Sequence, residues 1–183
     1  YSFEMPDEEV LIKAAFEKAT QDGTRERPWK IGTEGNPGGI TAYIDGDNTL
    51  YINKGESVAI MKDFDTDGHP APYIYSIHAI KEIVVSEGVP NIGDYAFYDP
   101  YGISRLTEVS LPDSLTKMGT YAFSGFSSLE KLTIPASVSV IGANCFAGDT
   151  NLHTVVFEGK PGDFTLIDDA AFAGVTAEVH VPS

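Results

Sequence analysis

The chain has 183 residues, of which 42% are hydrophobic, and its 27 acidic and 12 basic side chains give a net charge of −15 at pH 7. This length and apolar content allow one sizeable core with a small accessory unit. The charge excludes binding to nucleic acid phosphates or an anionic membrane through bulk electrostatics, and no apolar run approaches the roughly 20 residues that cross a bilayer. It favours solubility, or attraction to a basic patch on a partner.

Residues 1–35 are predicted to hold a helix and a connector. Asp7 is a helix-capping residue and Gly23 is a typical stop, so we expect a helix over residues 7–21. Its apolar positions form one stripe, which favours packing on its own domain over a regulatory or partner-binding role. A short strand is expected at residues 29–33.

Residues 36–79 are predicted to form a small β unit. Apolar segments at 40–44 and 50–52 flank the turn Asp45-Gly46-Asp47-Asn48, which is a hairpin signal, and residues 57–61 are expected to add a third strand. Such a unit would cap the array that follows, because the first coil of an array otherwise exposes its apolar interior.

Alternating carboxylates after this unit form a weak calcium candidate. Asp63, Asp65 and Asp67 match the opening of a calcium-binding loop, with Gly68 at the sixth position. The twelfth position holds Ile74 where a bidentate glutamate is needed. A solvated acidic turn is therefore the favoured interpretation, and no metal or other cofactor is expected.

The rest of the chain repeats one pattern, in units that begin at Ile80, Leu106, Leu129, Leu152 and Thr176. The residues three and five places after each start are apolar, as at Val109 and Leu111, which indicates a strand with one buried face. Three starts are 23 residues apart, a period typical of solenoids. Residues 80–183 are thus predicted to form a mainly β repeat solenoid, with a parallel sheet of about five strands and short segments on its convex side.

Glycine and phenylalanine recur beyond each strand. The glycines are Gly93, Gly119 and Gly142, and the phenylalanines are Phe97, Phe123, Phe146 and Phe172. The glycines are expected where the backbone turns through a left-handed conformation, and Asp168 replaces glycine in the fourth unit because aspartate tolerates that conformation. Each phenylalanine is expected to touch its equivalents in neighbouring coils.

The C-terminal end has no obvious capping helix. Val179 and Val181 complete a fifth strand near the last residue, Ser183. Either Phe172 and this strand cover the last coil, or the open strand edge pairs with another chain.

The stretches 106–123 and 129–146 share leucine, an apolar strand, proline, serine, glycine and phenylalanine in one register, and they resemble the BspA-type leucine-rich repeat of bacterial surface proteins. Residues 61–80 resemble the lead-in of such arrays. The resemblance implies a secreted or surface-displayed, extracellular protein that binds host or matrix proteins without catalysis. Because the chain begins at Tyr1, its N-terminus is expected to be processed or trimmed, so that any secretion signal is already removed.

No catalytic group can be assembled from the sequence. Cys145 and His153 could pair as nucleophile and base, but the column of Cys145 otherwise holds alanine, which indicates a small buried residue. The histidines, His69, His78, His153 and His180, lack metal-ligand spacing. The chain is therefore predicted not to be an enzyme.

Two surfaces remain as candidate binding sites. The first is the outward face of the predicted sheet, with Lys81, Glu82, Glu108, Ser110, Glu130, Lys131, Thr133, His153 and Thr154. A regular polar ladder of this kind serves solenoids as a surface for a protein ligand, although an ordinary solvated face has the same composition.

The second candidate is a set of tyrosines, Tyr95, Tyr98, Tyr101 and Tyr121. Tyrosines beside polar residues stack on sugar rings or anchor a protein, and they also occur at half-buried edges of repeats. The main functional prediction is a non-catalytic adhesion or protein-interaction module. The alternative is a carbohydrate-binding accessory domain that uses these tyrosines, if they are exposed and coplanar.

Overall fold

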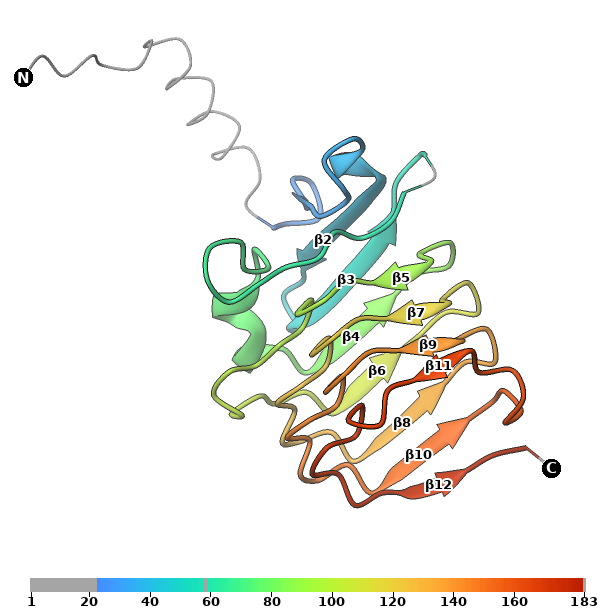
Figure 1. The fold of residues 1–183 in the computed structure, drawn as a ribbon. Coiled ribbons are helices and arrows are strands. Elements are labelled where there is room, and N and C mark those ends of the chain that lie inside the picture. Colours follow the sequence, from blue (N-terminus) through green and yellow to red (C-terminus); the bar gives the residue numbers. More distant parts are fainter. Residues whose placement is uncertain (1–22, 58, 183) are drawn as a thin grey trace, which may run out of the picture.

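The computed structural model describes residues 23–57 and 59–182, in which a β hairpin is followed by a solenoid of parallel strands (Figure 1). The helix expected over residues 7–21 lies outside the described residues. Within the described ranges nearly every element is a strand, which confirms the mainly β repeat solenoid.

The N-terminal hairpin forms where it was predicted. β2 (Ile40–Ile44) and β3 (Thr49–Lys54) pair antiparallel, and β1 (Trp29–Lys30) adds to the other edge of β2. The turn is held by Asp45, whose carboxylate accepts hydrogen bonds from the backbone N–H groups of Asp47 and Thr49 at 3.0 and 2.9 Å.

The prediction of a third strand at residues 57–61 is wrong. The described part of that segment contains only an isolated bridge between Met61 and Gly32, the residue that precedes the connector to η1 (Pro37–Gly39). The physical reason is a competing partner. Asn91 accepts a hydrogen bond from the Met61 N–H at 2.9 Å and donates one to the Met61 carbonyl at 3.1 Å.

The hairpin lies directly against the first coil of the solenoid. A 3-10 helix, η2 (Ile74–Ala79), leads into β4 (Glu82–Val85), and β4 pairs in parallel with β3. A single sheet therefore runs from β1 through the hairpin into the first two repeat units. The hairpin covers apolar surface that the first coil would otherwise expose.

Each repeat unit supplies one parallel strand at the predicted column. These strands are β4, β6 (Glu108–Ser110), β8 (Lys131–Ile134), β10 (Thr154–Phe157) and β12 (Glu178–His180). β4 pairs with β6, and β10 pairs with both β8 and β12, always with the apolar columns in register. β6 and β8 contact each other but belong to separate ladders.

A second parallel sheet closes the opposite side of the coils (Figure 1). Its strands are β5 (Asn91–Ile92), β7 (Lys117–Met118), β9 (Val140–Ile141) and β11 (Leu166–Ile167). Ile167 lies opposite Ile141, so the fourth unit fits the repeat once its three extra residues are allowed for.

Stacked aromatic rings fill the interior between the two sheets. The ring centroids of Phe97, Phe123, Phe146 and Phe172 follow one another at 5.0, 5.6 and 4.9 Å, which confirms the predicted contacts between coils. Tyr73, from the segment before the first unit, extends the stack at 6.0 Å from Phe97. Tyr73 is fully buried, and burial raises the pKa of its hydroxyl.

The repeated glycines serve a different purpose from the one expected. Gly93, Gly119 and Gly142 do not have left-handed backbones, and neither does Asp168. A Cβ atom at Gly93 would lie 2.1 Å from the carbonyl oxygen of Lys62 in the preceding segment, and the other two glycines are similarly crowded. Glycine is required at these positions because the coils approach too closely for a Cβ atom. The residues with left-handed backbones follow two places later, at Tyr95, Tyr121 and Asn144.

Substitution of Gly119 tests this explanation. A Cβ atom there would lie 2.5 Å from the Asp94 carboxylate and 2.6 Å from the Asp94 backbone nitrogen. We therefore expect Gly119→Ala to lower the free energy of unfolding in urea by about 1 to 3 kcal/mol, as overpacking does. At Gly162 no atom lies within 4 Å, so Gly162→Ala is a matched control that should change it by less than about 1 kcal/mol. Equal losses in both variants would contradict the explanation.

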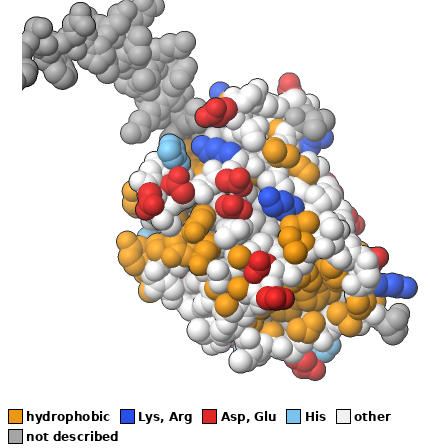
Figure 2. Space-filling model, viewed as in Figure 1, with side chains coloured by type: hydrophobic (Ala, Val, Ile, Leu, Met, Phe, Trp, Pro, Cys, Tyr) orange, Lys and Arg blue, Asp and Glu red, His pale blue; other side chains and the backbone are white. Residues whose placement is uncertain are grey.

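The C-terminal coil leaves apolar side chains exposed. Leu166, Val179 and Val181 are 56%, 57% and 50% exposed, and they line a cleft of about 380 Å³. Figure 2 shows this apolar surface at the lower right. Phe172 stacks on Phe146, so it covers the last coil only in part, and β12 forms the edge of its sheet.

Candidate functional site

The outer face of the repeat sheet brings together the nine residues predicted for protein binding. Glu82 lies opposite Glu108, and Lys131 lies opposite Thr154, because these residues occupy one column of the pleated strands. Glu108, Ser110 and Lys131 are exposed, whereas Glu82, Thr133 and Thr154 are half-buried. The remaining three, Lys81, Glu130 and His153, are exposed at the entrances to the strands.

The hairpin adds aromatic side chains to the same face. Tyr51 on β3 lies opposite Val84 on β4, and its ring stacks on that of Tyr43 at 4.8 Å. Loss of contact with water, together with the neighbouring Asp45 carboxylate, raises the pKa of Tyr51. The repeat columns gave no sign of these tyrosines, although the alternation through 50–52 could have placed Tyr51 on the outer face.

The predicted tyrosines form neither a flat platform nor a buried layer. Tyr95 and Tyr121 stack at 5.0 Å with their rings only 16° apart, and both are half-buried. Tyr98 meets both of them edge-on, at interplanar angles of 88° and 73°. Tyr101 stands apart and is 78% exposed. Partial burial, followed by the neighbouring Tyr121, raises the pKa of Tyr95.

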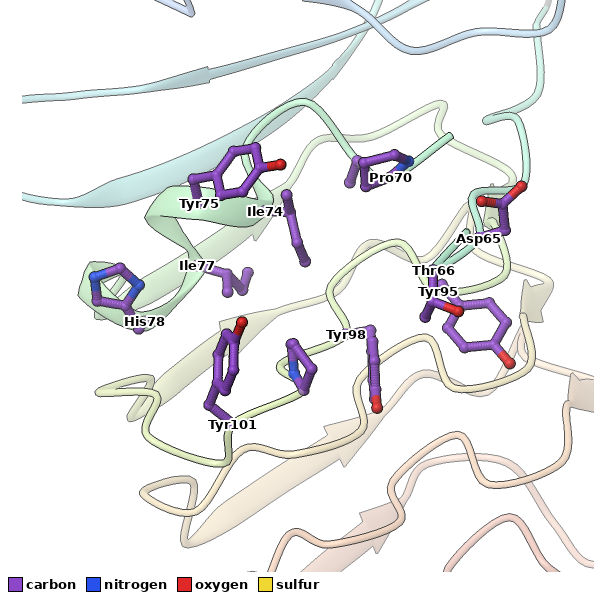
Figure 3. Close-up of a pocket in the computed structure, with 12 residues that line it drawn as sticks. Asp65, Thr66, Pro70, Ile74, Tyr75, Ile77, His78, Tyr95, Tyr98 and Tyr101 are labelled. Carbon is purple, nitrogen blue, oxygen red and sulfur yellow. The ribbon is translucent and has the colours of Figure 1, made fainter. Parts of the chain in front are cut away.

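Three of these tyrosines line a groove of about 400 Å³ (Figure 3). One wall comes from η2 and the residues before it, and the other comes from the loop between the first two repeat units. Figure 3 shows Ile74, Tyr75 and Ile77 on one side of the groove and Tyr98 and Tyr101 on the other, with Asp65 and Thr66 at one end. The sequence did not point to Tyr75, because it precedes the repeats and shares no column with the other tyrosines. His78 was considered only as a metal ligand.

The acidic turn organises the backbone around its own carboxylates. One oxygen of Asp65 accepts hydrogen bonds from the N–H groups of Asp67, Gly68 and His69, and these bonds hold the pKa of Asp65 below its ordinary value. Asp63 accepts a hydrogen bond from the Asp94 N–H at 2.9 Å. Within residues 23–57 and 59–182, no three histidine, cysteine or acidic side chains are grouped as metal ligands.

The structure does not bring Cys145 and His153 together as a nucleophile and its base. Cys145 is fully buried, and burial raises the pKa of its thiol. His153 is exposed at the start of β10 on the outer face. In the part of the chain that the structure describes, no helix is both long enough and apolar enough to cross a membrane.

Comparisons with known proteins bear on the whole array. The family model of the BspA type leucine rich repeat region matches residues 71–181 in six copies. None of the curated proteins compared with the chain matches it.

The chain is similar to several solved structures. A leucine-rich repeat protein from Eubacterium ventriosum aligns with a TM-score of 0.58 and 17% identity over 85% of this chain and 44% of that one. A leucine rich cell surface protein from Faecalibacterium prausnitzii gives 0.43 and 17% over 67% and 54%. For a leucine-rich repeat protein from Bacteroides capillosus the values are 0.42 and 24% over 67% and 96%. The chain thus spans about half the length of the first two proteins.

Proposed function

The chain belongs to the BspA-type leucine-rich repeat family, and we propose that it is a non-catalytic protein-interaction module, secreted by a bacterium or displayed on its surface. The observation that supports this most is the exposed, register-aligned outer face of the sheet. The strands hold the backbone of these residues in fixed positions, so that only their side chains have to be ordered when a partner binds.

The charge of this face indicates the chemistry of its partner. Glu82 and Glu108 are direct neighbours in one column, and Glu130 is exposed beside the next strand. Together with a net charge of −15, these carboxylates favour a partner that presents lysine or arginine side chains. Lys131 divides the carboxylates, and this sets the register in which such a partner docks.

The size of the face limits the affinity. Six strands, from β3 to β12, at spacings of about 4.8 Å give a face of roughly 400 Å², which is half of the about 800 Å² that each partner buries in a standard interface. A protein ligand is therefore expected to bind weakly, or to contact the strand entrances at Lys81, Glu130 and His153 as well as the strands themselves.

A triple substitution tests the proposal. We expect the purified chain to bind at least one of a panel of immobilised extracellular matrix proteins saturably, and to bind more weakly as salt is raised. Changing Glu108, Lys131 and Thr133 to alanine together should weaken that binding at least tenfold.

The matched control changes Lys117, Thr165 and Asp169, which are exposed near the opposite sheet and give the same change of charge. This control should bind like the unchanged chain, and both variants should melt at similar temperatures. Equal losses in the two variants, or no saturable binding to any matrix protein, would refute the outer face as the binding surface.

The alternative function is a carbohydrate-binding accessory domain. The observation in its favour is the groove of about 400 Å³, which contains Tyr95, Tyr98 and Tyr101. Tyr121 lies outside the groove and supports it by stacking on Tyr95.

A further inference from the structure

We infer that the groove between η2 and the loop around Tyr101 is a binding site for a neutral saccharide, whose sugar ring packs against Tyr75 and Tyr101. The inference rests on the carbohydrate-binding alternative above, and it is independent of binding at the outer face. It extends the site from the predicted tyrosines to Tyr75, His78 and Asp65, which come from the segment before the repeats.

Two large aromatic side chains stay in water at this groove. Tyr75 is 85% exposed and Tyr101 is 78% exposed, whereas Tyr73 and the phenylalanines Phe97, Phe123 and Phe146 are fully buried. A single exposed aromatic residue needs no explanation, but these two rings border the same groove (Figure 3). Figure 2 shows the apolar surface of this region at the left, with acidic side chains above it.

The loop that carries Tyr101 is fixed by a buried carboxylate. Asp99 is only 2% exposed, and its two oxygens accept hydrogen bonds from the N–H groups of Tyr101 and Ile103, each at 3.0 Å. Gly102 takes the left-handed conformation between them, at a φ of 62°. The backbone that carries Tyr101 is therefore fixed before any ligand arrives, which lowers the entropic cost of binding.

The opposite wall is anchored in the core. Tyr73 and Ile77, on either side of Tyr75 in η2, are both buried, and Tyr73 belongs to the aromatic stack. The backbone of Ser76 donates to the Tyr73 carbonyl at 2.8 Å, which sets the turn that points Tyr75 outward. Both tyrosines thus stand on rigid parts of the chain.

The polar end of the groove disfavours anionic ligands. Three backbone N–H groups hold Asp65 in its ionised form, and its second oxygen contacts the exposed ring of His69, at 3.1 Å. A carboxylate accepts hydrogen bonds from hydroxyl groups, and Thr66 beside it both donates and accepts. The Asp65 carboxylate repels sulfate, phosphate and sialic acid groups, and so does the net charge of −15.

The dimensions and the lining of the groove suit a short saccharide. A volume of about 400 Å³ lies within the range of about 300 to 1,000 Å³ for small-ligand pockets and is the size of a short oligosaccharide. Aromatic walls with a few hydroxyl and carboxylate groups at one end suit a pyranose, which has apolar C–H faces and a polar rim. Proline-rich peptides also bind aromatic grooves, so they are the competing ligand in the test.

The test is a binding screen of the whole chain against immobilised neutral oligosaccharides built from glucose, mannose, galactose, xylose or N-acetylglucosamine. Sialyllactose serves as the anionic probe and a proline-rich decapeptide as the peptide probe. We expect saturable binding to at least one neutral oligosaccharide and weaker binding to sialyllactose than to lactose. Tyr75→Ala and Tyr101→Ala should each weaken the binding at least tenfold, whereas Tyr75→Phe should retain most of it.

The controls separate this site from the outer face. Tyr43→Ala, which removes a ring from the outer face, should leave saccharide binding unchanged, and so should the triple substitution at Glu108, Lys131 and Thr133. Because Tyr75 and Tyr101 are exposed, variants at these positions should have the same melting temperature as the unchanged chain. The inference would be overturned if no neutral oligosaccharide bound, or if Tyr75→Ala abolished binding of the peptide but not of any saccharide. Neither outcome would affect the proposal for the outer face.

Discussion

Phe123→Ala is expected to lower the free energy of unfolding by about 3 to 5 kcal/mol, the range for removing a buried phenylalanine and leaving a cavity. Phe123 is fully buried and contacts Phe97 and Phe146, its equivalents in the coils on either side, as well as Phe126. Because the flanking strands fix the spacing of the coils, the neighbouring rings cannot close the gap. Urea unfolding followed by circular dichroism measures the loss.

Phe172 is the matched control at the end of the same stack. It is only half-buried, and Phe146 is its sole neighbour within the repeated column, with Phe157 meeting it edge-on. Phe172→Ala should therefore cost clearly less than Phe123→Ala. If the two variants lost the same free energy, the stack would not be the element that couples the coils.

The solenoid could be predicted from the sequence because every unit has the same pattern of apolar, glycine and phenylalanine positions. Val109 and Leu132 occupy the same place in their units, and so do Phe123 and Phe146, so that a strand and a ring were assigned to each coil without knowledge of distances. The glycine column was located correctly but explained wrongly. A sequence shows that only a small residue fits at Gly119, yet it does not distinguish a special backbone angle from a close approach of the neighbouring coil.

The groove depends on contacts that no repeat encodes. Tyr75 belongs to the segment before the first unit, and Tyr101 belongs to an insertion that only the first unit carries. Their proximity follows from how η2 folds over the first coil, so the predicted tyrosine site contained Tyr101 but missed Tyr75. The alignment of repeat units does not predict a site between a cap and an insertion, because neither segment has an equivalent in the other units.

Asp149 makes the stability of the fold depend on pH. Its side chain, near the end of the third unit, is fully buried, and one carboxylate oxygen accepts hydrogen bonds from the N–H groups of Gly125 and Phe126 in the second unit, at 3.0 and 2.8 Å. Its other oxygen has no hydrogen-bond partner within the described residues. Burial outweighs the two N–H groups and raises the pKa of Asp149 from 3.8 to about 8.

The sign of the effect follows from the proton balance. Between pH 3.8 and about 8 the folded chain keeps a proton on Asp149 that the unfolded chain has lost. The free energy of unfolding should then fall by about 1.4 kcal/mol for each pH unit in this window, and the contribution of Asp149 should level off above it. The stabilisation is complete below the unfolded pKa and is lost as the pH rises through the folded one.

Asp149→Asn isolates this contribution, because an amide does not titrate and its oxygen still accepts from Gly125 and Phe126. The free energy of unfolding of the variant should match that of the unchanged chain to within about 1 kcal/mol near pH 4.5 and exceed it by about 5 kcal/mol above pH 8, as measured by urea unfolding across the range.

Asp99→Asn is the control. Both oxygens of Asp99 accept hydrogen bonds from backbone N–H groups, so the amide would leave one of these groups unpaired and cost about 1 to 3 kcal/mol. A difference between the Asp149 variant and the unchanged chain that stayed constant with pH would show that the Asp149 carboxylate is ionised in the folded protein, and that the two backbone N–H groups outweigh its burial.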